Sequence, residues 1–306
     1  MEILVATEKP FAQIAIRQIR EVTEAAGYKL VLLENYKSMP ELLAGVSTAD
    51  AMIVRSDIVS AEVLDAAKNL KILVRAGSGY DNLDLEACTA HNVVAMNTPG
   101  QNSNAVAELV FELMLYQIRH GFSGKSGTEL RGKTIGLHAF GNVGKYVADI
   151  ARGFGMDVYA YDPFVSERVM KNNNAKQSIN IEELYTKCQY ISIHMPCNEV
   201  TKKSIGFDLM NKMPENAVLV NTARKEVIDE DGLLKVFETR PDFCYLSDIE
   251  PDCKAVFEEK YKGRYIFTAK KMGAQTEESN INAGVAAARQ IVEYFKTGKD
   301  KFKLNK

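Results

Sequence analysis

A loop rich in small residues, residues 135–144, carries the most informative chemistry of the sequence. It reads Ile-Gly-Leu-His-Ala-Phe-Gly-Asn-Val-Gly and stands between a β-rich run and a helical pattern. Small residues at such a place allow a tight turn, a close approach of the backbone to a pyrophosphate, and close packing of helix on strand. Gly141 and Gly144 fill the second and third glycine positions of a dinucleotide-binding loop, whereas Ala139, with its more restricted backbone, takes the first. The pattern predicts a dinucleotide site, with a structural turn that binds nothing as the alternative.

An acidic residue follows this loop where a nucleotide ribose would need one. Asp162 lies eighteen residues after Gly144, at the end of the next predicted strand, and no arginine occupies the five positions after it. Its carboxylate is suited to accept hydrogen bonds from ribose hydroxyls and would repel a 2′-phosphate. The sequence therefore favours NAD over NADP.

The cysteines, histidines and charges exclude several other chemistries. The five cysteines include no CxxC pair, and with only four histidines the chain predicts neither a disulfide framework nor a metal site. A net charge of -2 leaves no basic surplus for nucleic acid. No apolar run approaches the ~20 residues that cross a bilayer, and the first residues resemble a strand rather than a signal peptide. We therefore expect a soluble protein of the cytoplasm that binds neither nucleic acid nor membrane.

Short β-rich runs alternate with helical stretches along the chain, and these elements must position the loop. Continuous apolar strands separated by helices favour parallel sheets that are covered on both faces. The predicted strands are residues 3–6, 30–33, 51–54, 72–75, 93–96, 134–137, 158–161, 190–193, 217–220, 243–246 and 265–268. Long helices are predicted over residues 104–120, as a bridge between domains, and 276–296. Two consecutive doubly wound α/β domains fit this pattern best.

Five segments together resemble the D-2-hydroxyacid dehydrogenases. They are residues 75–84 (Arg-Ala-Gly-Ser-Gly-Tyr-Asp-Asn-Leu-Asp), 97–108, 155–163, 194–201 and 220–224 (Val-Asn-Thr-Ala-Arg). The resemblance covers nearly the whole chain and is strongest to the 3-phosphoglycerate dehydrogenases. It implies NAD as cofactor, a homodimer, and oxidation of 3-phospho-D-glycerate to 3-phosphohydroxypyruvate, the first step towards serine. Because the chain ends at Lys306, it also implies a short form without a C-terminal regulatory domain.

The resemblance further implies how the chain is divided and which residues bind ligands. Residues 1–101 and 276–306 would form a flavodoxin-like substrate domain, and residues 102–275 a Rossmann-type NAD domain, with the active site in the cleft between them. The implied cofactor-binding residues are Ser78, Gly141, Asn142, Val143, Gly144, Asp162, His194, Pro196, Thr201, Thr222, Ala223, Asp248 and Gly273. Of these, Asp248 would lie near the nicotinamide amide. Those implied to face the substrate are Arg75, Ala76, Gly77 and Asn102.

The family mechanism uses an arginine, a glutamate and a histidine, of which this chain shows two. Arg224 matches the arginine, whose forked guanidinium can bind two substrate oxygens, unless it is a surface arginine. Glu250 is taken as the glutamate, which in the family pairs with the histidine, although the spacer before it is shorter than usual in the family. The histidine is missing, and registering the chain on Gly273 places Lys271 at its position.

Lys271 is therefore predicted to move the proton to and from the substrate hydroxyl, although a free lysine amine titrates near ~10.4. The alternative is that Lys270 and Lys271 are two solvated lysines in a loop. Arg55 follows the third predicted strand and is suited to bind a substrate phosphate at the carboxyl edge of a sheet. Arg75 would assist it, unless either arginine forms a salt bridge instead.

Two other functions stay open at this point. One is a reductase of glyoxylate, hydroxypyruvate or another small 2-oxoacid. The other is a non-catalytic NAD-binding sensor or scaffold, which the missing histidine suggests and the retained Arg224 argues against.

Overall fold

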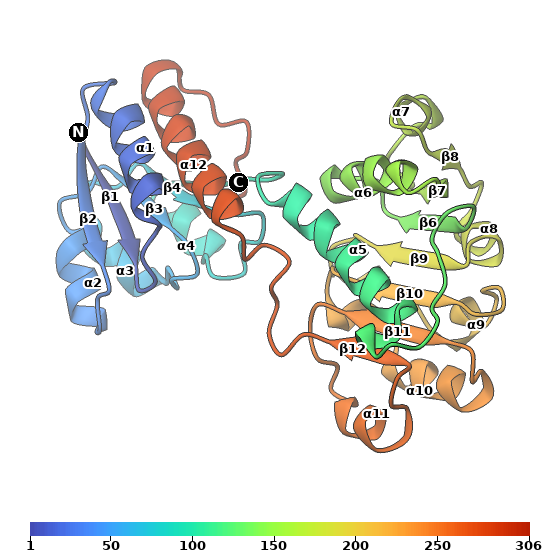
Figure 1. Cartoon of the computed structure of the whole chain (residues 1–306). Coiled ribbons are helices and arrows are strands. Elements are labelled where there is room, and N and C mark those ends of the chain that lie inside the picture. Colours follow the sequence, from blue (N-terminus) through green and yellow to red (C-terminus); the bar gives the residue numbers. More distant parts are fainter. The chain divides into compact units, whose positions relative to one another are not determined.

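The structure is a computed structural model that describes residues 1–306, and its chain divides into two compact units (Figure 1). Unit 1 comprises Met1–Asn102 and Gln275–Lys306, and unit 2 comprises Ser103–Ala274. Every helix falls short of the combined length and apolarity that crossing a membrane requires.

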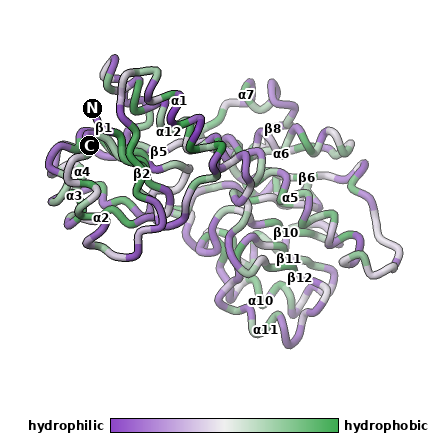
Figure 2. Tube along the Cα trace, turned by 60° about the vertical axis from the view of Figure 1, so that its left-hand side comes forward, coloured by the Kyte–Doolittle hydropathy of each residue, from purple (hydrophilic) through white to green (hydrophobic).

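Unit 1 is built on five parallel strands in the order β2-β1-β3-β4-β5. These are β1 (Glu2–Thr7), β2 (Lys29–Glu34), β3 (Ala51–Val54), β4 (Ile72–Arg75) and β5 (Val94–Asn97). The helices are α1 (Gln13–Glu24), α2 (Met39–Val46), α3 (Ala61–Ala66), α4 (Leu85–Ala90) and α12 (Glu277–Thr297). Because side chains alternate along a strand, Ile3 and Val5 pack with α1 and α12, whereas Leu4 and Ala6 pack with the other three helices. The apolar residues of β1 and β2 are green in Figure 2, and those of β1 are buried.

The last helix, α12, completes unit 1 by packing closely on α1. Thr276 caps its start by accepting a hydrogen bond from the Ser279 amide (3.1 Å), and Gly298 ends it in a left-handed conformation, with a φ of 72°. A Cβ at Gly284 would lie 2.9 Å from the Ile19 side chain, so glycine permits this close approach.

Unit 2 contains seven parallel strands in the order β12-β11-β10-β9-β6-β7-β8. These are β6 (Thr134–His138), β7 (Asp157–Tyr161), β8 (Lys176–Gln177), β9 (Tyr190–Ile193), β10 (Val218–Asn221), β11 (Cys244–Ser247) and β12 (Tyr265–Phe267). The α-helices are α5 (Ser103–Ile118), α6 (Asn142–Gly153), α7 (Glu167–Asn172), α8 (Ile181–Lys187), α9 (Phe207–Met210), α10 (Glu230–Thr239) and α11 (Lys254–Lys260). Two short 3₁₀ helices, η1 (His120–Phe122) and η2 (Lys225–Val227), complete the unit.

Each sheet reverses its strand order at one point, and these points matter for binding. Unit 1 has the flavodoxin-like order, with the reversal between β1 and β3, and the first six strands of unit 2 have the Rossmann order, with the reversal between β6 and β9. In open parallel sheets, ligands bind at the carboxyl ends of the strands next to such a reversal. Arg55 directly follows β3, and the turn of the glycine loop, residues 139–141, directly follows β6, so both lie at a reversal.

The predicted fold class, two doubly wound parallel-sheet domains, is confirmed. Strands β3, β4 and β9 occupy the residues that the apolar runs predicted. The two-residue strand β8 was not predicted, because it is exposed and has no apolar residue to mark it.

Candidate active site

The glycine loop turns sharply between β6 and α6. Ala139 has a φ of 79°, in the left-handed region that glycine enters easily and alanine does not. A Cβ at Gly144 would lie 2.8 Å from the Ala139 carbonyl oxygen, so only glycine lets α6 approach the turn this closely. Gly141 caps α6, and a Cβ there would meet nothing within 4 Å. The N-terminus of α6, which starts with Asn142 and Val143, thus faces open space and fits a pyrophosphate group.

The carboxylate of Asp162 holds this turn to the end of β7. Its Oδ2 accepts a hydrogen bond from the Phe140 amide (2.8 Å), and its Oδ1 accepts one from the Phe164 amide (2.8 Å). Asp162 is only half-buried, so the carboxylate can still be reached from solvent. The structure therefore gives Asp162 a bracing role that the sequence did not indicate, while ribose binding stays a prediction.

Two neutral histidines lie beside the loop, at the ends of β6 and β9. The His194 amide donates to the His138 carbonyl (2.9 Å), and His138 Nδ1 lies 3.2 Å from the Tyr185 hydroxyl. Burial lowers the pKa of His138 to about 4, partly offset by the charge of Asp162, and burial lowers the pKa of His194 to about 3. His194 Nε2 and the hydroxyl of Thr222 are buried without a hydrogen-bond partner. Such atoms are rare in proteins, and they fit the polar groups of a bound cofactor.

The segment after β10 brings two predicted catalytic residues together. Asn221 fixes the turn, since its Oδ1 accepts from the Ala223 amide (3.0 Å) and its Nδ2 donates to the Arg224 carbonyl (2.9 Å). The Ala223 carbonyl oxygen then accepts a hydrogen bond from Arg224 Nη1 (3.0 Å) and another from Lys271 Nζ. One backbone oxygen therefore holds the arginine and the exposed lysine side by side.

The carboxylate of Glu250 is paired with a lysine of the following helix. Its Oε1 forms an ion pair with Lys254 Nζ (2.6 Å), four residues further along the chain. Its pairing with Lys271 stays a prediction.

The loop after β9 is closed by a side chain predicted to border the cofactor. The hydroxyl of Thr201 donates to the Pro196 carbonyl (2.7 Å) and accepts from the Asn198 amide (2.8 Å). This pair of bonds fixes the position of Pro196, three residues after the buried end of β9.

Arg55 is held by neutral oxygen atoms at the carboxyl edge of unit 1. Its Nη1 donates to the carbonyls of Lys9 and Pro10 (both 3.0 Å), and its Nη2 donates to Asn280 Oδ1 (2.6 Å). The guanidinium also lies over the ring of Phe11, 5.1 Å from its centroid. A guanidinium carries five N–H groups, so these three bonds leave two for a ligand. Arg55 therefore does not form the salt bridge that was its alternative role.

The loop that follows β4 lies next to Arg55. Arg75 Nε donates to the Arg55 carbonyl (2.9 Å), and the Ala76 amide donates to the Val54 carbonyl (2.8 Å). Gly77 has a φ of 152°, a backbone conformation that L side chains rarely adopt, so this position favours glycine. Further along, the Ser78 hydroxyl donates to Asn102 Oδ1 (2.9 Å), which connects two residues predicted to contact ligands.

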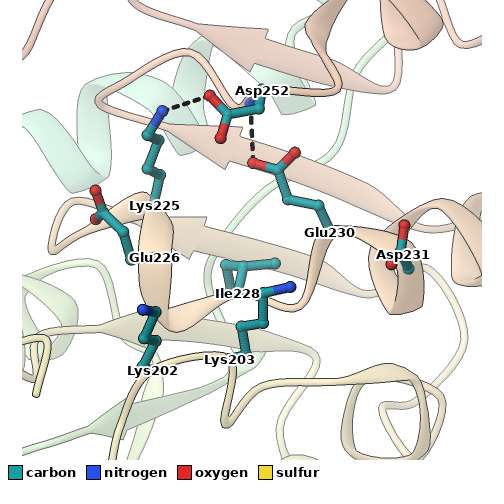
Figure 3. A pocket seen from close by; sticks show the side chains of 8 residues that line it. All are labelled: Lys202, Lys203, Lys225, Glu226, Ile228, Glu230, Asp231 and Asp252. Carbon is teal, nitrogen blue, oxygen red and sulfur yellow. Dashed lines mark hydrogen bonds and ion pairs between the residues drawn. The ribbon is translucent and has the colours of Figure 1, made fainter. Parts of the chain in front are cut away.

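A charged hollow of about 290 Å³ is lined in part by the residues that follow Arg224 in the chain (Figure 3). None of the predicted site residues lines it; its walls are Lys202, Lys203, Lys225, Glu226, Ile228, Glu230, Asp231 and Asp252. Lys225 pairs with Asp252 (2.5 Å), while the Glu230 carboxylate accepts from the amides of Asp252 (2.9 Å) and Cys253 (2.8 Å). These bonds hold the segment after Arg224 to the segment after Glu250.

Sequence reasoning missed the residues that hold the predicted ones. Asn280, which accepts a hydrogen bond from Arg55, is one example, and Asn97, whose Nδ2 donates to the Ser78 carbonyl (2.7 Å), is another. No pattern in the sequence marks them, because each finds its partner only through the fold. The structure contains no group of three or more histidine, cysteine, aspartate or glutamate side chains placed to hold a metal ion.

The family description "D-isomer specific 2-hydroxyacid dehydrogenase, NAD binding domain" matches residues 110–252. The hydroxypyruvate reductase of Thermotoga maritima is 32% identical over 283 residues, which cover 86% of this chain and 90% of that protein. The D-3-phosphoglycerate dehydrogenase of Archaeoglobus fulgidus is 33% identical over 97% of this chain, but this chain spans only 58% of that protein's length.

Among solved structures, the chain is similar to the 3-phosphoglycerate dehydrogenase of Entamoeba histolytica with NAD⁺ bound. The two share 47% identity over 100% of this chain and 99% of that one, with a TM-score of 0.87. At 20% identity, the D-lactate dehydrogenase of Escherichia coli shares the fold, with a TM-score of 0.78. Together with the site geometry, these matches show that the chain belongs to the D-isomer specific 2-hydroxyacid dehydrogenase family and is an oxidoreductase that uses NAD.

Proposed function

We propose that this protein oxidises 3-phospho-D-glycerate at C2 to 3-phosphohydroxypyruvate, the first step towards serine. The observation that carries the choice of substrate is Arg55, a guanidinium at the strand reversal of unit 1 with two N–H groups that no protein atom accepts. The names of the Archaeoglobus and Entamoeba relatives support the same substrate. A homodimer is expected from the family resemblance, and a cytoplasmic location from the sequence, whose first residues do not resemble a signal peptide.

Arg55 is suited to a phosphate because it is already fixed in place. Its bonds to two backbone carbonyls and to Asn280 restrict a side chain that would otherwise lose rotamer freedom on binding. The two remaining N–H groups can donate to two phosphate oxygens, as arginine commonly does. Arg75, whose Nε donates to the Arg55 carbonyl, adds a second positive charge at this edge.

Arg224 and Lys271 would carry the chemistry at the edge of unit 2. Arg224 binds the substrate carboxylate and stabilises the negative charge that the C2 oxygen develops. Lys271, as a neutral amine, accepts the proton of the C2 hydroxyl, and as an ammonium returns it in the reverse direction. Bound NAD⁺ supplies the acceptor for the C2 hydride.

Residues of unit 2 would hold that cofactor. The N-terminus of α6 and the amides of the glycine loop would bind the pyrophosphate. Asp162 would accept hydrogen bonds from the adenosine ribose, and the unpartnered atoms of His194 and Thr222 would face the cofactor's polar groups.

Phosphorylated and unphosphorylated substrates tested with the same variants decide the proposal. Arg55→Ala should raise KM for 3-phosphoglycerate with little change in kcat, because the lost contact is common to ground and transition states. Arg17→Ala, an exposed arginine on α1, is the matched control and should leave KM unchanged. If wild type and Arg55→Ala have the same KM for 3-phosphoglycerate, Arg55 does not bind the phosphate.

A second candidate is the reduction of hydroxypyruvate, favoured by the name of the Thermotoga relative. Steady-state assays at the NADH absorbance band separate the two. Turnover of hydroxypyruvate with no turnover of 3-phosphoglycerate would favour this second function.

A further inference from the structure

Asp248 is a buried carboxylate whose two oxygens both bind one irregular loop. It directly follows β11 and is 1% exposed. Its Oδ1 accepts from the Met272 amide (2.8 Å), and its Oδ2 accepts from the Gly273 amide (2.8 Å). The hydroxyl of Thr268 lies 3.2 Å from Oδ1 as a third donor, although it also reaches the Lys270 carbonyl (3.0 Å). One side chain thus satisfies donors at both ends of the segment 268–273.

The close fit of this loop on the carboxylate explains the glycine that follows Met272. A Cβ at Gly273 would lie 2.8 Å from Asp248 Oδ2, closer than real Cβ contacts. Its other neighbours would be side chains of Val106 and Leu109 on α5, at 3.3 and 3.5 Å. Any larger residue would therefore push the loop away from the carboxylate or away from α5.

Lys271 is the residue directly before the two amides that Asp248 binds. Its amine reaches the Ala223 carbonyl, which Arg224 Nη1 also uses. Residues 268–276 contain no helix or strand, so no regular hydrogen-bond ladder fixes the backbone of Lys271. The hydrogen bonds that Asp248 accepts from the amides of the next two residues, Met272 and Gly273, take that place.

We infer that Asp248 is a positioning residue for proton transfer: it holds the 268–273 loop so that the Lys271 amine stays beside Arg224. This inference rests on the proposed function of Lys271. A displacement of the order of 1 Å at a reacting group can cost about 10²-fold in rate, so the brace matters even though Asp248 does not touch the proton. This positioning role differs from a contact between Asp248 and the nicotinamide amide, which would act through the affinity for the cofactor.

Asp248→Asn tests the brace, because an amide keeps the size of the side chain but offers only one acceptor oxygen. The expected result is a fall in kcat of about 10-fold to 10²-fold, with the Kd of NADH changed less than about twofold. Deuterium exchange of the peptide covering residues 268–275, measured by mass spectrometry, should speed up by about tenfold or more. Asp157→Asn is the matched control, since its carboxylate is 57% exposed and lies at the start of β7. It should change none of the three quantities.

Gly273→Ala perturbs the same contact while leaving the carboxylate in place. It should reproduce the loss of kcat and the faster exchange, so the inference does not depend on the folding of one variant. A rise in the Kd of NADH without a fall in kcat in Asp248→Asn would overturn the brace in favour of a nicotinamide contact. Unchanged deuterium exchange in both variants would also overturn it.

Double substitution separates this inference from the proposed function. In a Lys271→Ala background, Asp248→Asn should cost no further rate, because the residue that it positions is gone. Fully additive losses would overturn the positioning role while leaving Lys271 as the proton carrier. Wild-type rates for Lys271→Ala alone would instead remove Lys271 from the chemistry, and with it the role of Asp248 in proton transfer.

Discussion

The carboxyl edges of the two sheets each present positive charge, but they hold it in different ways. In unit 1, three neutral oxygens fix the guanidinium of Arg55, and the buried carboxylate of Asp57 accepts a hydrogen bond from the Arg55 amide (3.2 Å). In unit 2, Arg224 and Lys271 share a single carbonyl, and Lys271 lies on a loop without regular structure. The first arrangement is rigid and keeps two donors for a ligand, whereas the second brings two cations to one point.

This difference corresponds to two kinds of work. A group that binds a remote part of the substrate contributes the same energy before and during the reaction, so it benefits from being fixed. A group that exchanges a proton must be placed with respect to a partner whose charge changes. We therefore expect substitutions at the unit 1 edge to change KM and those at the unit 2 edge to change kcat.

The largest expected effect is that of Lys271→Ala. It should lower kcat by about 10²–10⁴-fold, the usual contribution of general acid–base catalysis, while the Kd of NADH stays nearly constant. Lys270→Ala, its exposed neighbour, is the control and should cost far less. Lys271→His should move the basic limb of kcat/KM towards ~6.5, the reference value for histidine. A Lys271→Ala enzyme that affects KM alone would abolish the contrast between the two edges.

Acid should destabilise unit 2 through its two buried histidines. Their folded pKa values, about 4 for His138 and about 3 for His194, lie below the unfolded value near ~6.5. The contribution of the two neutral histidines to the free energy of unfolding is therefore fully present above pH ~6.5. Below that pH it falls by about 1.4 kcal/mol per pH unit for each histidine. Thermal unfolding followed between pH 7.5 and 5 measures this slope.

Replacing one buried histidine by an uncharged amide side chain tests whether that histidine causes the loss of stability in acid. His138→Gln should flatten the slope, while His120→Gln, at an exposed histidine, should leave it unchanged. Equal slopes in all three proteins would mean that other groups control the acid response.

Asp162→Ala should weaken NAD binding by about 1–2 kcal/mol, the scale of a hydrogen bond to a charged group. Because Asp162 also accepts a hydrogen bond from the Phe140 amide, the variant should loosen the glycine loop in addition to losing the ribose contact. Calorimetric titration of NAD and NADP measures both effects. Equal affinities of wild type for NAD and NADP would show that Asp162 does not select between them.

The smallest expected effect is that of Ala139→Gly. Relief of a left-handed alanine should stabilise the protein, offset by the greater freedom of glycine in the unfolded chain, for a net gain of about 0.5–1 kcal/mol. Gly77→Ala in unit 1 is the opposite case, since it would place an alanine at a φ of 152°, which L side chains rarely adopt. Melting temperatures of both variants check the pair; a lower value for Ala139→Gly would show that its φ of 79° costs the fold nothing.

The sequence predicted most strands because parallel strands buried on both faces are continuous apolar runs, as in Ala51–Val54 and Tyr190–Ile193. The same logic located Arg55, since residues that follow such strands lie at the carboxyl edge, whereas Arg224 was located by family resemblance. Lys271 was located only by its register on Gly273 and by family resemblance.

The supporting residues could not be predicted, because their partners are distant along the chain. Asp57 illustrates this: its Oδ1 accepts from the Glu8 amide (2.7 Å) and from the Tyr36 hydroxyl (2.8 Å), and only the fold brings these together. Burial beside Asp57 raises the pKa of Tyr36, which keeps its hydroxyl a donor. Local spacing contains no information about such contacts.

The split sequence of unit 1 has a consequence for the order in which the protein forms. Unit 2 is one continuous segment, whereas α1 must wait for α12, which is synthesised about 250 residues later. Asn280 lies on α12, so the hold on Arg55 is also incomplete until then. A chain emerging from the ribosome, or one diluted out of denaturant, should therefore regain NADH binding before it regains selectivity for a phosphorylated substrate.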